Sequence, residues 1–517
     1  MLEKLKLKLK KQLNVVVLFL LGAYASNIFP PFDGNIVAFG CLLLFLSYLL
    51  YEKRNFMANF MIAYWFGIAF FLCGFSWITN AFLIDGETFG AYIPLVSVVI
   101  GLFFGLFVAI PAGFIKFGEN VYQRAIIFCL AFSVFEWIRS FIFTGFPWNL
   151  LGSALAFDVR LISGAAYIGT YGLSIMLLMF LSGLAILLIG LKQKKLYRLS
   201  GVFLFIPLMF FGLSFGTYKE IKDGDFMVRL VQPSIPQTFK WDKKLAQENF
   251  EKHINLSKKE GVEKARLIVW GEAASPFYLD RDEEHLLDIM EIIPDNGLLV
   301  TGLLRAGIER GDIVIYNSMF AIDNKIGIRD YYDKSHLVPF GEYLPFREYL
   351  PDFMRPIANV VGDIGKGEKY KTMRLEGFPN MAGSICYESI FPSEVIAKGN
   401  KPEILLVLAN DGWYGISDGP YQHLVASQLR AIEEGITVVR SANTGISAVV
   451  KPNGDIVGRI GLNEVGISDV YLPEVLVKDT IYGKYGNWVV VVLWLLLMVL
   501  GGCAKVLSYV HRHSLVY

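Results

Sequence analysis

The sequence predicts a membrane protein in which a bundle of eight transmembrane helices is joined to one α/β domain of roughly 250 residues. Of the 517 residues 54% are hydrophobic, and the mean hydropathy of +0.47 is higher than soluble domains show. Long apolar stretches fill the first part of the chain and recur near the C-terminus, with a polar block between them. We therefore expect three segments, at 1–219, 220–480 and 481–517.

The first predicted span follows a basic N-terminus with five lysines, Lys4, Lys6, Lys8, Lys10 and Lys11. After its apolar run, Val15–Leu21, comes Ala23-Tyr24-Ala25, which is similar to a signal-peptidase site, so a cleaved signal peptide is the alternative. We favour an uncleaved span because apolar residues resume at once. Seven further apolar stretches can each cross a bilayer, at about 35–51, 57–78, 89–115, 125–143, 162–190, 199–216 and 487–509.

Basic residues set the expected orientation of these spans. They gather in alternate loops, at Lys53, Arg54, Lys116, Arg124, Lys192, Lys194, Lys195 and Arg198. These loops share a side with the lysine-rich N-terminus and with Arg512, whereas an intervening connection carries Asp85 and Glu87. By the positive-inside rule both termini are cytoplasmic and the polar block lies outside. In a bacterium this predicts an inner-membrane protein whose polar block faces the periplasm.

The polar block has the alternating patterns of a layered α/β domain. Seven runs have strand composition, at Phe226–Val231, Ala265–Trp270, Gly297–Gly302, Ile313–Phe320, Ile404–Ala409, Thr437–Arg440 and Ser447–Val450. Three segments have helical periodicity, at 243–259, 282–293 and 420–434. The net charge of +1, without a basic domain, argues against a nucleic-acid partner.

Cys386 is the one cysteine of the polar block. The four others lie in apolar runs and are expected to be buried small hydrophobes, namely Cys41, Cys73, Cys129 and Cys503. The apolar run Met381–Ile385 ends in a sharp polar turn that would present Cys386 at the tip of a strand, where a nucleophile is accessible. The alternative is a buried, inert thiol.

Glu272 and Lys334 could complete a site for acyl transfer to a cysteine. Glu272 follows a buried-strand pattern, and burial would raise its pKa and suit it to general-base work; a helix-starting glutamate is the alternative. Lys334 lies between aromatic residues and a Pro-Gly loop and could stabilise an oxyanion; a surface lysine paired with Asp333 is the alternative. The backbone N–H of Tyr387 could add an oxyanion donor. Glu342 could hold the lysine, and the alternative is that it caps a turn.

Other chemistries find less support. The histidines of the polar block are scattered without metal-ligand spacing, so we predict no metal; they are His253, His285, His336 and His423. Gly-rich phosphate loops are absent, and we predict no cofactor. No Ser-His-Asp arrangement is evident.

Glu272, Lys334 and Cys386 lie in motifs that resemble those of the nitrilase superfamily, whose members use a Glu-Lys-Cys triad. The matching motifs are Trp270-Gly271-Glu272, Tyr332-Asp333-Lys334 and Cys386-Tyr387-Glu388, flanked by Asn410–Trp413 and Arg440–Gly445. This resemblance implies an αββα sandwich. Four further motifs resemble the bacterial apolipoprotein N-acyltransferase family over essentially the whole chain, at Glu136–Arg139, Thr144–Trp148, Gln232–Gln237 and Lys240–Asp242.

This second resemblance implies a reaction and a set of residue roles. Members of the family move an acyl chain, typically from the sn-1 position of a phospholipid, through a cysteine thioester to the α-amino group of the diacylglyceryl-cysteine of an apolipoprotein. Carried over, Cys386 is the nucleophile, Glu272 the general base and Lys334 the oxyanion stabiliser. The remaining matches are a supporting Glu342 and the pocket or loop positions Trp241, Tyr387 and Glu388. We expect a monomer.

Some further expectations concern the surroundings of the site. An apolar lid would keep water from a thioester, and Leu344–Val361 is the expected lid, with an ordinary amphipathic surface loop as the alternative. Glu136 and Arg139 are expected to pair on one helix face, with a contact to a lipid headgroup as the alternative. Three tryptophans are expected to anchor the bundle at the membrane interface, Trp77, Trp137 and Trp148.

Two other classes of protein stay open. A membrane-tethered amidase or nitrilase that hydrolyses a small amide would share the triad, although one span would suffice as its tether. A transporter or receptor with an inactive outer domain is disfavoured by the intact triad and by the few intramembrane charges.

Overall fold

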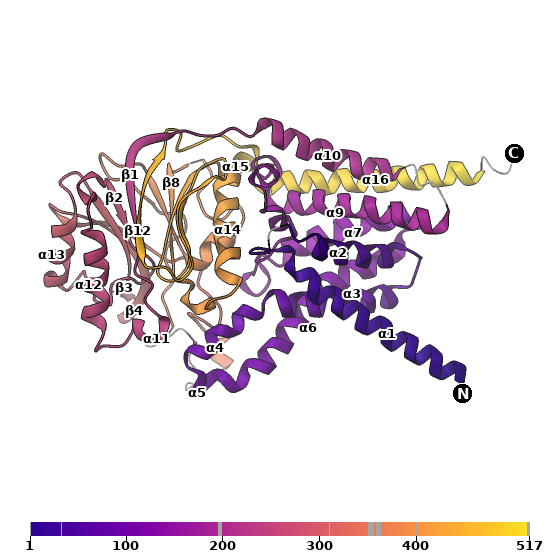
Figure 1. Cartoon of the computed structure of the whole chain (residues 1–517), viewed down its shortest axis with the longest axis horizontal. Helices are drawn as coiled ribbons and strands as arrows, with labels where there is room; N and C mark the ends of the chain where they lie inside the picture. The colour runs from indigo at the N-terminus through magenta and orange to yellow at the C-terminus, as the bar shows by residue number, and fades with distance from the viewer. Residues whose placement is uncertain are drawn as a thin grey trace. The chain divides into compact units, whose positions relative to one another are not determined.

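The structure, a computed structural model, describes residues 2–32, 34–194, 199–309, 311–349, 356–357, 363–399 and 401–513 (Figure 1). Lys195 and Arg198 of the predicted basic loop lie outside these residues. Backbone contacts group the chain into two compact units. Unit 1 comprises 1–79, 91–218 and 485–517, and unit 2 comprises 80–90 and 219–484.

Unit 1 consists of helices. The longer ones are α1 (Leu2–Ala25), α2 (Ile36–Leu50), α3 (Phe56–Gly74), α6 (Ile93–Phe114), α7 (Val121–Ile138), α9 (Ala165–Gln193), α10 (Ser200–Thr217) and α16 (Trp488–His513). Among the described residues five helical segments are long and apolar enough to cross a membrane, at Phe56–Gly74, Gly86–Phe117, Val121–Ile138, Ala165–Gln193 and Ser200–Thr217. Three more apolar helices are shorter, at Gln12–Ile28, Ile36–Leu50 and Trp488–Cys503. The chain is therefore a membrane protein, and the total of eight spans stays a prediction.

Small residues let two of these helices approach closely. A Cβ atom added at Gly67 of α3 would lie 2.9 Å from the carbonyl oxygen of Gly105 in α6. Helix association in a bilayer depends on such close packing, because lipid tails compete equally well for apolar side chains. Aromatic rings fill the wider gaps, as in the stack of Phe45 on Phe66 with centroids 3.9 Å apart.

Glu136 and Arg139 interact electrostatically, as expected. The direct ion pairs of the described residues do not include this pair. Both side chains instead serve the loop after α7: Glu136 accepts a hydrogen bond from the Leu151 N–H at 2.6 Å, and Arg139 donates to the Asn149 carbonyl at 3.4 Å. Buried backbone groups need such partners because water does not reach them.

Two of the three tryptophans that were expected at the membrane interface are buried. Trp77 and Trp148 are only 5% and 3% exposed, and their ring centroids are 4.5 Å apart. Trp137 packs against the rings of Phe141 and Trp494. Trp77 and Trp148 are thus buried against each other. The place of the three tryptophans at the membrane interface stays a prediction.

Unit 2 contains two six-stranded sheets. The first has the order β12 (Gly466–Pro473), β1 (Asp223–Gln232), β2 (Leu267–Val269), β3 (Leu298–Glu309), β4 (Asp312–Asp323), β5 (Gly327–Asp333). The second has the order β11 (Ile456–Ile460), β10 (Ser447–Val450), β9 (Thr437–Ala442), β8 (Ile404–Ala409), β7 (Met381–Ile385), β6 (Thr372–Met373). The main helices are α12 (Ala246–Ser257), α13 (Glu283–Ile292) and α14 (Gly419–Glu434).

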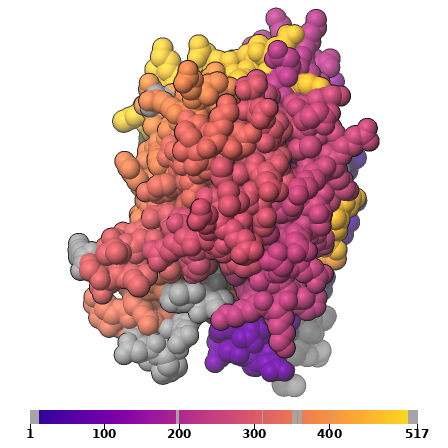
Figure 2. Space-filling model, turned by 90° about the vertical axis from the view of Figure 1, so that its left-hand side faces the viewer, coloured from indigo at the N-terminus to yellow at the C-terminus, as the bar shows by residue number. Residues whose placement is uncertain are grey.

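The two sheets lie between helical layers, which confirms the expected αββα sandwich (Figure 1). Side chains alternate along each strand, so Val228 and Leu230 of β1 join a core between the sheets, while Met227 and Val231 pack under α12 and α13. The outer face of the second sheet packs on α14 through Ala431. Figure 2 views unit 2 from the side of α12 and α13. This layering brings the ends of β2, β5, β7 and β8 to one region, where the predicted site residues lie.

Candidate active site

Cys386 stands at a strained turn. β7 ends at Ile385, and Cys386 opens the short 3₁₀ helix η9 (Cys386–Ile390) with φ of 52°. A residue with a Cβ pays about 1–2 kcal/mol for this left-handed conformation. Such strain is retained where the surrounding structure imposes it. The predicted position at a strand tip is confirmed, whereas the nucleophilic role stays a prediction.

The carboxylate of Glu388 holds this turn through hydrogen bonds to the backbone. One carboxylate oxygen accepts from the Ile385 N–H at 2.7 Å, and the other accepts from the backbone N–H groups of Ser335 and His336 at 2.7 and 2.9 Å. The hydroxyl of Tyr332 donates to the same oxygen at 2.8 Å. Glu388 thereby joins the Cys386 turn to the segment that follows β5. Its role is to hold the backbone, and burial raises the pKa of its carboxyl group.

Glu388→Gln should therefore destabilise unit 2. The amide would turn an N–H₂ group toward backbone N–H donors and leave at least one of them unpaired, which costs about 2 kcal/mol. Thermal unfolding of the purified protein in detergent measures this, with Glu376→Gln at an exposed position as the control. An unchanged melting temperature for Glu388→Gln would contradict the assignment.

Lys334 lies between two carboxylates. It follows β5 and is 1% exposed, and its Nζ is 2.8 Å from Glu342 Oε1 and 3.7 Å from Glu272 Oε1. Burial alone would lower the pKa of Lys334, but Glu342 and Glu272 together raise it above its ordinary value. Lys334 is therefore a fixed cation, and the alternative of a surface lysine paired with Asp333 is wrong. Asp333 pairs instead with Arg305, at 2.6 Å.

Glu272 presents one bonded and one free carboxylate oxygen. The Asn317 side-chain N–H₂ donates to Glu272 Oε1 at 2.8 Å and to Glu342 Oε1 at 3.2 Å, which ties the two carboxylates together. Glu272 Oε2 is buried without a hydrogen-bond partner. The backbone carbonyl of Glu272 accepts from Lys240 Nζ at 2.7 Å. Oε2 is thus the atom that could take a proton from a neighbouring group.

The thiol of Cys386 is in electrostatic contact with this cluster. Burial raises the pKa of Cys386, the carboxylate of Glu272 raises it further, and the ammonium of Lys334 opposes both. The resting cysteine is therefore a neutral thiol, which needs a base before it can attack an acyl carbon. The structure brings together Glu272, Lys334 and Cys386, as well as the supporting Glu342.

Tyr414 is a neighbour of the thiol that sequence reasoning missed. It ends the 3₁₀ helix η10 (Asp411–Tyr414) after β8, and its hydroxyl is 3.9 Å from Cys386 Sγ. Its carbonyl accepts from the Asn80 side chain at 2.7 Å, within unit 2. The only signal for Tyr414 was its place directly after the flanking motif Asn410–Trp413.

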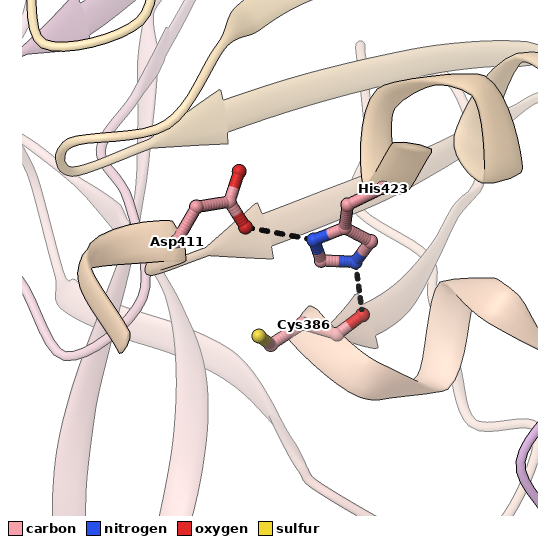
Figure 3. A group of neighbouring side chains, drawn as sticks. All are labelled: Cys386, Asp411 and His423. Carbon is pink, nitrogen blue, oxygen red and sulfur yellow. Dashed lines mark hydrogen bonds and ion pairs between the residues drawn. The ribbon is translucent and has the colours of Figure 1, made fainter. Parts of the chain in front are cut away.

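His423 reaches the site from α14. Its Nδ1 is 2.7 Å from Asp411 Oδ1, and its Nε2 is 3.0 Å from both the Cys386 carbonyl and Ser389 Oγ (Figure 3). A hydrogen-bonded Ser-His-Asp chain therefore exists, contrary to the sequence expectation. Ser389 is fully buried and donates to the Cys386 carbonyl, so it is not placed to attack a substrate.

Among the described side chains, one set of three has donor atoms close enough to hold a metal ion together. The donor atoms of Cys386, Asp411 and His423 lie within 4.8 Å of one another. Figure 3 shows the sulfur on the side away from the imidazole, while both ring nitrogens face other partners. The arrangement is that of a hydrogen-bonded network, and the absence of a metal stays a prediction.

A cavity of about 250 Å³ opens beside Glu272. Its polar lining includes Glu272, Asn317, Glu342 and Asn410, and its aromatic lining consists of Trp241, Phe277, Tyr278 and Trp413. Lys240 also lines it, and burial lowers the pKa of this lysine to about 8. A cavity that combines aromatic walls with polar and charged groups can hold the acyl chain and the polar ester of a lipid substrate.

Of the residues expected in the substrate pocket or its loops, Tyr387 and Glu388 do not line this cavity. The ring of Tyr387 packs against His336 and Phe391, with centroid distances of 5.6 and 5.2 Å. Glu388 bonds to the backbone behind the nucleophile, as described above. Of the three positions expected in the substrate pocket or its loops, Trp241 lines the cavity.

The predicted lid is described only in part, since residues 350–355 and 358–362 lie outside the described ranges. Leu344 is buried, whereas Phe346 and Tyr349 are 64% and 79% exposed. The backbone of Phe340 binds that of Tyr343 at 2.8 Å and that of Ile357 at 2.9 Å, which ties the two ends of the segment together. The exposed aromatic rings suit an apolar cover, and its role as a lid stays a prediction.

The sandwich fold and the Glu-Lys-Cys cluster define a carbon–nitrogen hydrolase domain, here attached to membrane helices. The carbon-nitrogen hydrolase family matches residues 227–482, and the apolipoprotein N-acyltransferase N-terminal domain matches residues 21–184. Among solved structures, an amidase from Nesterenkonia sp. AN1 in complex with acrylamide matches 52% of this chain and 100% of its own, at 19% identity and a TM-score of 0.35.

Relatives of known name align over nearly the whole chain. An apolipoprotein N-acyltransferase from Brucella melitensis is 33% identical over 516 residues, which cover 96% of each chain. That from Rickettsia typhi is 34% identical over 477 residues, which cover 92% of this chain and 95% of its own. The chain belongs to the apolipoprotein N-acyltransferase family.

Proposed function

We propose that this chain acylates the N-terminus of apolipoproteins through a thioester on Cys386. The acceptor is the α-amino group of the S-diacylglyceryl-cysteine, and the donor is a membrane phospholipid. The observation that carries the mechanism is the buried Lys334 ammonium, held by Glu342 and Glu272 in electrostatic contact with the thiol. A fixed cation at this position stabilises negative charge only when it develops, in the transition state.

In the first half-reaction Glu272 Oε2 takes the thiol proton as Cys386 Sγ attacks the ester carbonyl carbon of the phospholipid. The carbonyl oxygen becomes an oxyanion that faces Lys334 and the Tyr387 N–H. The tetrahedral intermediate collapses with cleavage of the ester C–O bond, and Glu272 returns the proton to the leaving alkoxide. The products are the acyl thioester and a lysophospholipid.

In the second half-reaction the neutral amino group of the apolipoprotein attacks the thioester carbonyl. Glu272 takes a proton from the attacking nitrogen, the same donors stabilise the second oxyanion, and the C–S bond breaks. The thiolate recovers the proton from Glu272. The products are the N-acylated lipoprotein and free Cys386, so the kinetics should be ping-pong.

The proposed reaction takes place at the membrane. Five long apolar helices and three shorter ones support a bundle of eight spans. The alternating basic loops support cytoplasmic termini and a catalytic unit at the periplasmic face of the inner membrane. A monomer suffices for this arrangement, because every proposed catalytic group comes from one chain.

Lys334→Met should lower the rate constant of both half-reactions by about 10²–10³, because it removes one oxyanion-stabilising group. It also leaves Glu272 and Glu342 without their cation, so a loss of stability of about 3 kcal/mol is expected. Single-turnover acyl transfer and thermal unfolding measure the two effects. Lys371→Met, at a partly exposed lysine paired with Asp330, serves as the control. Wild-type transfer rates in Lys334→Met would exclude the oxyanion role.

The reaction itself is tested with purified protein, phospholipid in detergent, and a synthetic peptide that begins with S-diacylglyceryl-cysteine. The peptide should gain the mass of one fatty acyl group, and lysophospholipid should appear in equal amount. Release of free fatty acid without peptide acylation, or release of ammonia from a small amide, would instead support the membrane-tethered hydrolase.

A further inference from the structure

The mechanism above assigns no role to His423, the buried histidine next to Cys386. His423 is fully buried, and its Nε2 faces the carbonyl oxygen of Cys386 at 3.0 Å. Asp411 holds the other ring nitrogen at 2.7 Å and is itself held by Arg440 Nη2 at 2.8 Å. A chain of buried charged and polar groups thus ends on one backbone carbonyl (Figure 3).

Two donors converge on this carbonyl. The Cys386 carbonyl and the Asp411 carboxylate both only accept, so hydrogens are assigned to both ring nitrogens. The imidazole is then a cation paired with Asp411, although burial and Arg440 lower the pKa of His423. Ser389 Oγ donates to the same oxygen at 3.0 Å. Because Cys386 has φ of 52°, its backbone would relax to a commoner conformation if nothing opposed it. The two donors fix the orientation of the peptide plane that joins Cys386 to Tyr387.

The orientation of that plane determines where the Tyr387 N–H points. In a planar trans peptide the C=O and the following N–H point in opposite directions. With the Cys386 carbonyl directed at His423, the Tyr387 N–H points away from the imidazole. Figure 3 shows the sulfur of Cys386 on that side as well. The thiol and the N–H thus both lie away from the Cys386 carbonyl oxygen, an arrangement in which both can reach one substrate carbonyl.

We propose that His423 is a positioning residue that aims the Tyr387 N–H at the oxyanion formed when Cys386 attacks an acyl carbon. The hydrogen bond to the carbonyl also polarises the peptide, which makes its N–H a stronger donor. Asp411 and Arg440 keep the imidazole in place. This role rests on the thioester mechanism proposed above, and the experiment separates the two.

A matched pair of variants isolates the one hydrogen bond at issue. His423→Gln can place an amide N–H near the position of Nε2 and keep the bond to the Cys386 carbonyl. His423→Asn places its amide near the position of Nδ1, which keeps the contact with Asp411 but loses the carbonyl. The probe reactions are acylation of Cys386 by a mixture of phosphatidylethanolamine and phosphatidylglycerol, and alkylation of Cys386 by iodoacetamide. Alkylation forms no oxyanion, so it reports the thiol and the fold alone.

His423→Asn should acylate about 10²-fold more slowly than wild type with little change in KM, as for loss of an oxyanion donor. Its alkylation rate should stay within about threefold, and His423→Gln should acylate within about fivefold of wild type. Equal loss of both reactions in His423→Asn, wild-type acylation by it, or failure of His423→Gln to preserve acylation would each overturn the proposal.

A second variant covers the case in which His423→Asn does not fold. Ser389→Ala removes the other donor to the same carbonyl and should slow acylation about tenfold while alkylation is unchanged. Unchanged acylation in Ser389→Ala would then overturn the proposal. If the wild type itself alkylates but never acylates, the thioester mechanism fails rather than the role of His423.

Discussion

Cys386→Ser should reduce N-acylation by about four orders of magnitude or more, because the nucleophile is lost while the site around it stays intact. Serine is nearly isosteric with cysteine and can keep the left-handed turn with its carbonyl bonds to His423 and Ser389. Its hydroxyl has a far higher pKa than a thiol, so Glu272 cannot activate it to the same extent.

Initial rates of peptide acylation measure this effect, and thermal unfolding shows whether the variant is folded. Cys41→Ser, at a partly buried cysteine of unit 1, should keep wild-type rates. A folded Cys386→Ser that retains more than a few per cent of the activity would show that the thiol of this residue is not required and would contradict the thioester mechanism. The alternative of a buried inert thiol would then return.

Glu272→Gln should lower both half-reactions by about 10³, within the range that general-base catalysis supplies. Glutamine has nearly the same shape and can still accept from the Asn317 amide, but it cannot take a proton from the thiol or from the attacking amine. The stability should change little, because Lys334 keeps its closer partner Glu342 at 2.8 Å.

Rapid-mixing measurements of thioester formation and of thioester consumption test the two half-reactions separately. The exposed Glu248→Gln of α12 is the control. If only the second half-reaction slows, another group must take the thiol proton. Tyr414, whose hydroxyl is 3.9 Å from the sulfur, would be the first residue to examine.

Much of unit 2 could be predicted from strand periodicity. The seven predicted strands fall within or around β1, β2, β3, β4, β8, β9 and β10, because these strands are buried and apolar. β5 was missed because its sequence, Gly327–Asp333, has a single aliphatic residue among charged residues and tyrosines and lies at a sheet edge. The turn at Cys386 could be predicted because the short apolar run Met381–Ile385 ends directly before polar residues.

The polar network of α14 could not be predicted. Its glutamine, arginine and glutamate side chains have the pattern of a solvated helix face, yet Arg430 and Glu433 are buried, with their side chains 2.8 Å apart. His423 lies on the same helix and meets Asp411 and Cys386 only through the packing of α14 on η9. Partners 12 and 37 residues apart in the chain give no local signal.

The intact mass of the purified protein after incubation with phospholipid in detergent tests the central claim most directly. The wild type should gain the mass of one fatty acyl group, which hydroxylamine or the acceptor peptide then removes, and Cys386→Ser should gain no adduct that the acceptor peptide removes. Peptide acylation by a wild type that never carries an acyl group, or an adduct on a residue other than Cys386, would contradict the account.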